Sequence, residues 1–162
     1  GVPLWSVGGA WQLSKENWWQ STLFPELRLR ATYGYNGNVN RQVSVFPTFQ
    51  SASSNITGLA TGIITNPGNP SLRWERVQII NLGADIATKN NRIAGSVEYF
   101  YKNASDLIGE IFADPTTGLS NIRNRVNYAG MKTRGLDIDV SSKNLIGTFN
   151  WQSHYLISHV RN

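Results

Sequence analysis

The strongest constraint on this chain is an alternation of apolar and polar side chains with a period of two residues. The apolar positions of this alternation are Leu82, Ala84, Ile86, Ile93, Gly95, Val97, Tyr99 and Tyr101. The positions between them are Asn81, Gly83, Asp85, Arg92, Ser96, Glu98 and Lys102. Successive side chains of a β-strand point to opposite faces of the sheet. The pattern therefore predicts two strands, each with one apolar and one polar face.

The two alternating segments are separated by the short polar stretch Lys89-Asn90-Asn91. A short polar turn between two alternating runs is typical of an antiparallel hairpin. Similar alternation occurs elsewhere, as in Leu27, Leu29, Ala31, Tyr33 and Tyr35 and in Leu136, Ile138 and Val140. Six strands are predicted, at residues 2–13, 26–37, 72–88, 92–107, 125–142 and 147–160. We therefore expect an all-β protein built as an antiparallel meander.

The connections between these strands differ in length. Residues 89–91 and 143–146 are short turns, whereas residues 38–71 and 108–124 are long loops rich in Ser, Thr, Asn and Gly. The link at residues 14–25 falls on the side of the short turns and is expected to hold a helical turn. Outer-membrane barrels have this asymmetry, with long loops outside and short turns on the periplasmic side.

The hydrophobic pattern excludes helical membrane spans and is compatible with membrane-spanning strands. No segment contains eighteen uninterrupted apolar residues, whereas a tilted strand crosses the bilayer with about ten residues. Backbone groups of strands in lipid must all pair, which only a closed barrel achieves. The smallest such barrels have eight strands, so six strands predict an arc of a larger barrel. The first residues lack the basic start of a signal peptide, and we expect the chain to begin inside a longer protein.

Composition excludes several other classes. The net charge is +5, but the basic residues are scattered singly along the chain, so we predict no nucleic-acid partner. The chain has no cysteine, which leaves neither a disulfide framework nor a thiolate metal site. Six Trp and six Tyr residues are suited to a membrane interface. Candidates for such aromatic girdles are Trp74, Tyr99, Tyr101, Tyr128, Trp151 and Tyr155.

Catalytic and metal chemistry have weak support. Four carboxylates lie on the polar face, namely Asp85, Glu98, Asp137 and Asp139. They could form a glycosidase pair, but we favour groups that line a barrel interior and pair with Arg and Lys of neighbouring strands. His154 and His159 are five residues apart on one strand, hence on opposite faces, and cannot share a metal. We assign no catalytic residue, no metal and no cofactor, and we expect no enzyme activity.

Four blocks of the sequence, in this order, resemble a known family. They are LRLRATYGYNGN (27–38), NPSLRWERVQIINLGADIATKNNRIAGSVEYFYKNASDLI (69–108), NRVNYAGMKTRGLDIDV (124–140) and FNWQSHYLISHVRN (149–162). The order is similar to the C-terminal half of the barrel in SusC/RagA-type TonB-dependent outer-membrane transporters of Bacteroidetes. Tyr35-Asn36 departs slightly from the usual form of the first block, LKLRASYGxTGN, without disturbing the alternation.

The resemblance implies a 22-stranded transmembrane barrel in the outer membrane of a Gram-negative cell, with residues 1–162 as part of the barrel domain. It also implies an N-terminal plug domain, which these residues do not include, and through it coupling to TonB. A SusD-like lipoprotein commonly caps such barrels. The implied function is uptake of oligosaccharides or peptides, with outer-membrane lipids around the wall.

The long loop at 38–71 is the candidate site for ligand recognition, because loops on a rigid scaffold carry binding. Its rings and amides could stack on and hydrogen-bond to sugars or peptides; the candidates are Arg41, Gln42, Phe46, Phe49, Gln50 and Asn55. The loop could equally pack only against a lipoprotein lid. The alternative for the whole chain is a soluble all-β carbohydrate-binding or adhesion module, which would enclose Leu82, Ile86, Val97 and Ile138 in a core.

Overall fold

A computed structural model describes residues 3–38, 44–118 and 122–162. Its strands are β1 (Trp5–Gln12), β2 (Glu26–Asn38), β3 (Thr48–Ser53), β4 (Ala60–Asn66), β5 (Glu75–Ala87), β6 (Ile93–Phe112), β7 (Arg123–Leu145) and β8 (Trp151–Arg161). Three short 3-10 turns accompany them, η1 (Leu13–Lys15), η2 (Lys89–Asn91) and η3 (Pro115–Thr117). Over the described ranges, the structure contains no helix with the length and apolar character needed to cross a membrane.

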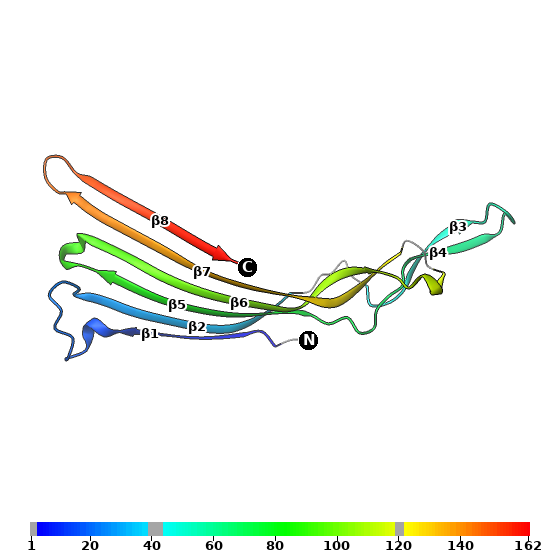
Figure 1. The fold of residues 1–162 in the computed structure, drawn as a ribbon, viewed down its shortest axis with the longest axis horizontal. Coiled ribbons are helices and arrows are strands. Elements are labelled where there is room, and N and C mark those ends of the chain that lie inside the picture. The colour runs from blue at the N-terminus through cyan, green and yellow to red at the C-terminus, as the bar shows by residue number, and fades with distance from the viewer. Residues whose placement is uncertain (1–2, 39–43, 119–121) are drawn as a thin grey trace. The chain divides into compact units, whose positions relative to one another are not determined.

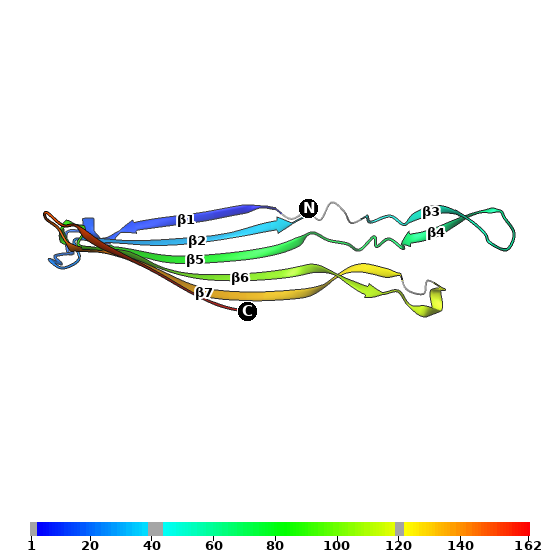
Figure 2. The same cartoon turned by 90° about the horizontal axis from the view of Figure 1, so that it is seen from above.

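Six of the strands form one sheet in the order β1-β2-β5-β6-β7-β8, and β3 pairs with β4 in a separate hairpin (Figure 1). Figure 2 shows β1, β2, β5, β6 and β7 side by side in the same order from another direction. Apart from the inserted hairpin, neighbours in the sheet are consecutive along the chain. The β1–β2 and β7–β8 pairs are antiparallel. The prediction of an all-β antiparallel meander is confirmed.

Contacts divide the chain into two units, which are described separately below. The strand unit comprises Pro3–Asn36, Val77–Asn103 and Met131–Asn162. The hairpin unit comprises the described residues of Gly37–Arg76 and Ala104–Gly130. The strand unit therefore holds most of the sheet, and the hairpin unit holds β3, β4 and the ends of β6 and β7 that flank their connection.

The strand register places apolar side chains on one face of the strand unit and polar side chains on the other. On the apolar face the opposed pairs include Val7 and Tyr33, Trp11 and Leu29, Ile138 and Ile157, and Val140 and Tyr155. On the polar face they include Gln12 and Arg28, Ala10 and Arg30, and Asp137 and Ser158. Directly opposed residues of an antiparallel pair share a face. The alternation found in the sequence is thus realised across neighbouring strands.

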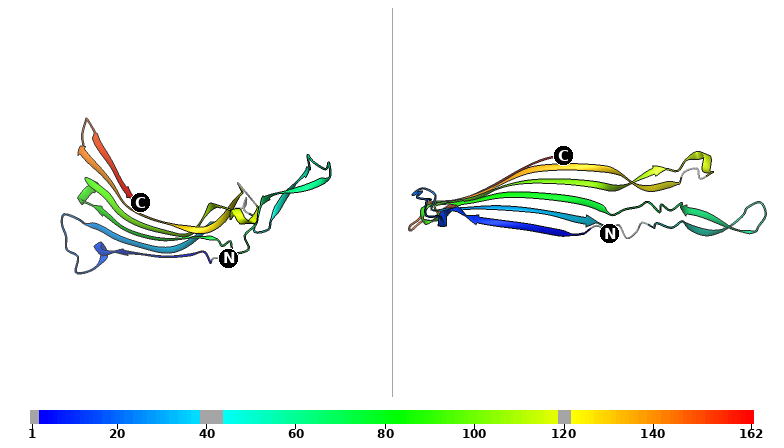
Figure 3. Two further views of the ribbon diagram at one scale, coloured as in Figure 1. Left: turned by 45° about the vertical axis from the view of Figure 1, so that its right-hand side comes forward. Right: turned by 90° about the horizontal axis from the view of Figure 1, so that it is seen from below.

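Three connections of the strand unit lie at one end of its strands, those of β1–β2, β5–β6 and β7–β8 (Figure 3). The β5–β6 turn is the one predicted at residues 89–91. Asn90 and Asn91 have φ angles of 62° and 51° there, a left-handed conformation that Asn tolerates better than most residues. The β7–β8 turn follows Leu145 rather than Ser142, because β7 continues three residues beyond the predicted strand end.

Side chains of the sheet are not enclosed by a second layer. The hydrophobic residues that are buried among those described are Leu13, Ala87 and Ala104, each 8% exposed. Leu82 is 49% exposed and Ile157 is 60% exposed, although both lie on the apolar face. A soluble sandwich would place such residues in a closed core. The described residues therefore do not form the closed core that the soluble alternative requires.

In the hairpin unit, the described parts of the two predicted loops contain more β-structure than the sequence predicts. The segment 38–71 contains the β3–β4 hairpin, and β6 and β7 extend to Phe112 and from Arg123. Their connection is consequently residues 113–122 instead of 108–124. It contains η3, where the backbone N–H of Thr116 and then its hydroxyl donate to Asp114. These hydrogen bonds lower the pKa of the Asp114 carboxyl, since they favour its charged form.

Candidate functional site

The polar face of the strand unit carries an ion-pair network across three strands. Arg30 of β2 donates two hydrogen bonds to Asp85 of β5, from Nε and Nη2, both 3.0 Å long. The same Nη2 lies 3.6 Å from Oε2 of Glu98 on β6. Gly83 leaves room for the guanidinium, because a Cβ there would lie 3.1 Å from Nη2. Arg30 therefore ties β2 to β5 and β6.

The other two carboxylates of this face also have partners on a neighbouring strand. Asp137 accepts a hydrogen bond of 2.5 Å from the hydroxyl of Ser158. Asp139 lies 2.8 Å from Nε2 of His154. All four carboxylates considered as glycosidase groups are thus paired between strands, as expected of groups that line a polar face.

The two histidines of β8 lie on opposite faces, as predicted, because His154 opposes Ser141 and His159 opposes Leu136. Within the described ranges, no group of three or more His, Asp or Glu side chains is arranged to hold a metal ion. The donor set at His154 consists of one imidazole and one carboxylate. The strand unit therefore presents no metal-binding geometry among its described residues.

One large apolar side chain departs from the polar pattern of this face. The ring of Phe100 lies over Gly135 of β7, where an added Cβ would clash with its Cζ. The ammonium of Lys102 lies 5.2 Å from the centre of the Phe100 ring. An aromatic ring that covers a glycine on the next strand supplies the packing that the glycine lacks. Alternation alone does not reveal this pair.

The apolar face carries one aromatic cluster near the start of β1. Trp5, Tyr33 and Tyr35 are mutual neighbours, with ring centres 5.4 to 5.7 Å apart. The Tyr33 hydroxyl hydrogen-bonds to the Tyr35 hydroxyl at 3.1 Å and accepts from the amide of Gln78 at 3.0 Å. Rings that combine an apolar body with a paired polar tip suit a membrane interface.

A second aromatic cluster lies at the other end of β1. Trp11 contacts Trp18, and Trp18 contacts Trp19, with ring centres 6.4 and 6.0 Å apart. Trp5 and Trp11 are six residues apart on β1, hence about 20 Å at the rise of a strand. The apolar band of outer-membrane barrels is about 25 Å tall and flanked by aromatic girdles.

These six clustered rings differ from the girdle candidates named from the sequence. The sequence signal that could have found them is the pairing of an aromatic strand start, Trp5, with the alternating Tyr33 and Tyr35. Trp18 and Trp19 lie in the link between β1 and β2.

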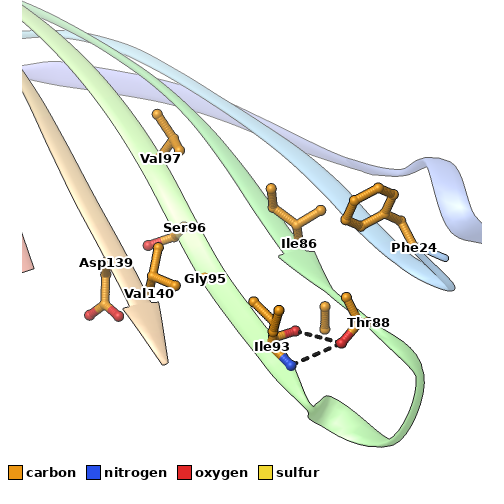
Figure 4. Close-up of a pocket in the computed structure, with 10 residues that line it drawn as sticks. Phe24, Ile86, Thr88, Ile93, Gly95, Ser96, Val97, Asp139 and Val140 are labelled. Carbon is orange, nitrogen blue, oxygen red and sulfur yellow. Dashed lines mark hydrogen bonds between the residues drawn. The ribbon is translucent and has the colours of Figure 1, made fainter. Parts of the chain in front are cut away.

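At the short-turn end, β5, β6 and β7 leave a small apolar hollow of about 80 Å³ (Figure 4). Figure 4 shows Phe24, Ile86 and Ile93 among its lining residues. Gly95 brings β6 close to β7, since an added Cβ would lie 2.5 Å from the carbonyl oxygen of Asp139. Hydrogen bonds between Thr88 and Ile93 close the adjacent turn. The hollow is too small and too apolar for a polar nutrient.

In the hairpin unit a polar junction forms around Asp106 of β6. Asp106 has a φ of 57°, and its side chain is only 16% exposed. Arg76 Nη2 lies 2.6 Å from its Oδ2, and Arg73 Nη2 lies 3.7 Å from its Oδ1. Asn127 of β7 donates to the carbonyls of Asp106 and Arg73 and accepts from the N–H of Arg73. This junction binds the segment before β5 to both β6 and β7.

Further hydrogen bonds extend the junction. Glu75 accepts from the side chain of Asn38 and from the backbone N–H of Ile108, both at 3.0 Å. Asn69 donates to the carbonyl of Arg125 at 2.9 Å. Three of the sequence blocks that carry the family resemblance therefore meet in this unit, because their polar residues hydrogen-bond to one another.

A larger hollow, of about 530 Å³, lies in the same unit. Its lining residues come from the hairpin segment and from the paired ends of β6 and β7, namely Ser44, Thr48, Ile64, Thr65, Asn66, Glu110, Ile122, Arg123 and Arg125. Glu110 lies 3.3 Å from Arg123 Nη1 and 3.4 Å from Arg125 Nε. Two guanidinium groups and one carboxylate give this hollow an excess of one positive charge.

The residues predicted to bind ligand are placed only in part. Phe46 and Phe49 are 76% and 75% exposed, and Asn55 is exposed in the β3–β4 turn. Arg41 and Gln42 lie outside the described residues. The hollow itself is lined by their neighbours in sequence and by residues at the ends of β6 and β7. The sequence did not predict the latter, because they are distant along the chain from the candidate loop.

The strands form an antiparallel meander with one ion-paired polar face and one apolar face that lies between two aromatic clusters. These features are typical of the strands of outer-membrane β-barrels. The sequence matches the family described as "TonB dependent receptor-like, beta-barrel" over residues 1–160. The chain belongs to this family. Its members are receptors and transporters, so the glycosidase hypothesis has no support from the family.

Individual relatives agree with this assignment. TonB-dependent receptor P26 of Formosa agariphila is 27% identical over 97% of this chain and 16% of the relative. TonB-dependent receptor SusC of Bacteroides thetaiotaomicron is 22% identical over 94% of this chain and 16% of the relative. The chain thus spans about a sixth of these relatives.

A solved structure titled as the RagAB peptide importer in the "open-open" state has a similar fold. Its TM-score is 0.80 at 22% sequence identity, and the match covers 98% of this chain and 17% of the other. At this identity the likeness concerns the fold, which is that of a TonB-dependent barrel.

Proposed function

We propose that the complete protein is an outer-membrane importer of oligomeric nutrients, either oligosaccharides or peptides, driven through TonB. In it, residues 1–162 supply wall strands of the barrel and loops on its outer side. The observation that carries this proposal is the apolar face of the strand unit, bounded by Trp5, Tyr33 and Tyr35 at one end and by Trp11 and Trp18 at the other. Family membership and the likeness to the RagAB peptide importer support it.

The wall role is tested by the surroundings of two adjacent residues. This chain has no cysteine, so Val97→Cys and Ser96→Cys each introduce one site for a spin label. In membranes, the label at residue 97 should be reached by oxygen, which concentrates in lipid, in preference to a water-soluble nickel chelate. The label at residue 96 should be reached less by oxygen. Equal accessibility at both positions would contradict the proposed orientation of the sheet.

Nutrient capture is assigned to the segment that contains the β3–β4 hairpin, with Arg41, Gln42, Phe46, Phe49 and Asn55 as contacts. The exposure of the two phenylalanine rings supports this assignment, because exposed aromatic rings stack on sugars and peptide groups. Replacing both rings, as Phe46→Ala with Phe49→Ala, should lower uptake of labelled nutrient in cells that contain TonB. Leu23→Ala, an equally exposed change in the β1–β2 link, serves as the control. Equal uptake by the two variants would show that Phe46 and Phe49 do not contribute to nutrient binding.

A SusD-like lipoprotein is the second proposed partner of the hairpin. Its apolar residues Ile56, Leu59 and Ile63 are more than half exposed. Exposed apolar side chains that lie together mark surfaces that bind another protein. The similarity to SusC and to the RagAB importer supports a partner of this kind. Ile56→Asp with Leu59→Asp should reduce co-purification of a SusD-like lipoprotein with the receptor, while the receptor remains in the outer membrane. Unchanged co-purification would place the lipoprotein elsewhere.

A further inference from the structure

The charge of the hairpin-unit hollow points to a class of ligand, and the argument rests on the proposed import function. We propose that this hollow binds a carboxylate group of the nutrient, with Arg123 as its principal ligand. The hollow is about 530 Å³, within the range of small-molecule sites. Its walls come from the hairpin segment and from the ends of β6 and β7, so a ligand there would touch both together.

The neutral polar groups of the hollow are already used for internal hydrogen bonds. The hydroxyls of Thr48 and Thr65 lie 3.0 Å apart, and that of Thr65 also donates to the Thr48 carbonyl. Asn66 donates to the Ser44 carbonyl and accepts from the N–H of Gly68. The Ser44 hydroxyl donates to the carbonyl of Phe46. Recognition by these groups would require their hydrogen bonds to be exchanged, whereas Arg123 contacts Glu110 through only one of its nitrogens.

Arg123 is suited to a second carboxylate. A guanidinium has five N–H donors in a planar fork, and the contact of Arg123 with Glu110 involves one nitrogen, Nη1, at 3.3 Å. The Arg123 side chain is 61% exposed, and its guanidinium lies over the ring of Phe112 at 5.3 Å. The ring limits the positions that the guanidinium can take. Arg125 adds a second positive charge on the same wall.

Glu110 and Arg123 are expected to have opposite effects on the binding of a carboxylate. It is the carboxylate that both arginines contact, so an incoming carboxylate competes with it for the same guanidinium groups. Removing the charge of Glu110 should strengthen binding of a carboxylate, and removing the charge of Arg123 should weaken it. A site that selected shape alone would respond to neither change in this opposed way.

The test measures binding to the purified full-length receptor. The probes are trigalacturonate and its neutral methyl ester, and an acetylated, amidated peptide with two glutamates and its glutamine counterpart. The two acidic probes distinguish a sugar acid from a peptide as the source of the carboxylate. Wild-type protein should prefer at least one acidic probe over its neutral match, and the preference should shrink as salt is raised.

The variants give the decisive comparison. Arg123→Gln should weaken binding of the preferred acidic probe about 5- to 10-fold, as expected for loss of one partly exposed charge contact. Glu110→Gln should strengthen it. Arg73→Gln is the matched control, since Arg73 is also exposed and paired with a carboxylate but does not line the hollow. Loss of affinity with Arg73→Gln equal to that with Arg123→Gln would overturn the inference.

Equal binding of acidic and neutral probes by wild-type protein would also overturn it, and so would failure of both acidic probes to bind. Neither result touches the proposed import function, which is judged by TonB-dependent uptake of a nutrient mixture. Absence of that uptake, with acidic probes still bound through Arg123, would refute import and retain the carboxylate site.

Discussion

Arg30 and Asp85 meet on the polar face of the sheet through two hydrogen bonds, from Nε to Oδ2 and from Nη2 to Oδ1, both 3.0 Å long. The two residues are distant in sequence and lie on β2 and β5, between which the chain forms the whole β3–β4 hairpin. Bidentate pairs of this kind fix geometry as well as adding energy. The pair therefore fits the observed register of two strands that no short turn connects.

Removing this pair should cost a modest amount of stability. Both side chains are more than one third exposed, so a double-mutant cycle with Arg30→Met and Asp85→Leu should give a coupling of about 0.5–1 kcal/mol. The measurement is urea unfolding of the full-length receptor in lipid vesicles. Glu98 provides the comparison, because its contact with Arg30 is longer, at 3.6 Å. A larger coupling for Glu98 than for Asp85 would contradict the geometry.

The assignment of the two faces predicts unequal costs for arginine at neighbouring positions. Val97→Arg should destabilise the protein in a bilayer by about 2–4 kcal/mol if residue 97 lies near its middle. Ser96→Arg, on the polar face, should cost much less. Refolding yield and unfolding free energy in vesicles measure both effects. Equal losses of unfolding free energy at the two positions would contradict the proposed assignment of the two faces.

The contact of Phe100 with Gly135 predicts a steric effect of a single methyl group. Gly135→Ala should cost about 1–3 kcal/mol of unfolding free energy, because the ring occupies the place of the added Cβ. Gly9→Ala is the control, since a Cβ at Gly9 meets nothing within 4 Å. Combining Gly135→Ala with Phe100→Ala should remove the part of the clash that the ring causes, while the backbone oxygen of His159 would still lie 2.9 Å from the added Cβ. Additive losses in the double variant would show that the ring is not its cause.

Asp106 should tolerate asparagine better than alanine. Its positive φ suits Asp and Asn but strains alanine, and its carboxylate is held by Arg76 at 2.6 Å. Asp106→Ala should cost about 1–3 kcal/mol, and Asp106→Asn less. Amide hydrogen exchange at Arg73 and Ile108, which lie in the junction around Asp106, should be faster in Asp106→Ala than in Asp106→Asn. Equal exchange rates in both variants would contradict the expectation that the positive φ of residue 106 strains alanine.

The strands and their two faces could be read from the sequence because each depends on a local property. Whether Leu82 is apolar and Asp85 is charged is visible without knowing their neighbours, and a period of two converts that into faces. The four motif blocks indicated the family, which the match to that family over residues 1–160 then established. The β3–β4 hairpin escaped this reading, since its strands are short, rich in Ser, Thr and Gly, and held by backbone pairing more than by an apolar face.

By itself, then, the sequence determined the strand periodicity, the polarity of each face, the turn at Asn90 and the membership of a barrel family. Only the tertiary structure decided which side chains meet: Arg30 with Asp85, Phe100 with Gly135, and Arg123 with Glu110. The reason is that alternation follows from each residue's own position along a strand. Contacts across strands depend on register, which is set by backbone pairing between segments distant in sequence.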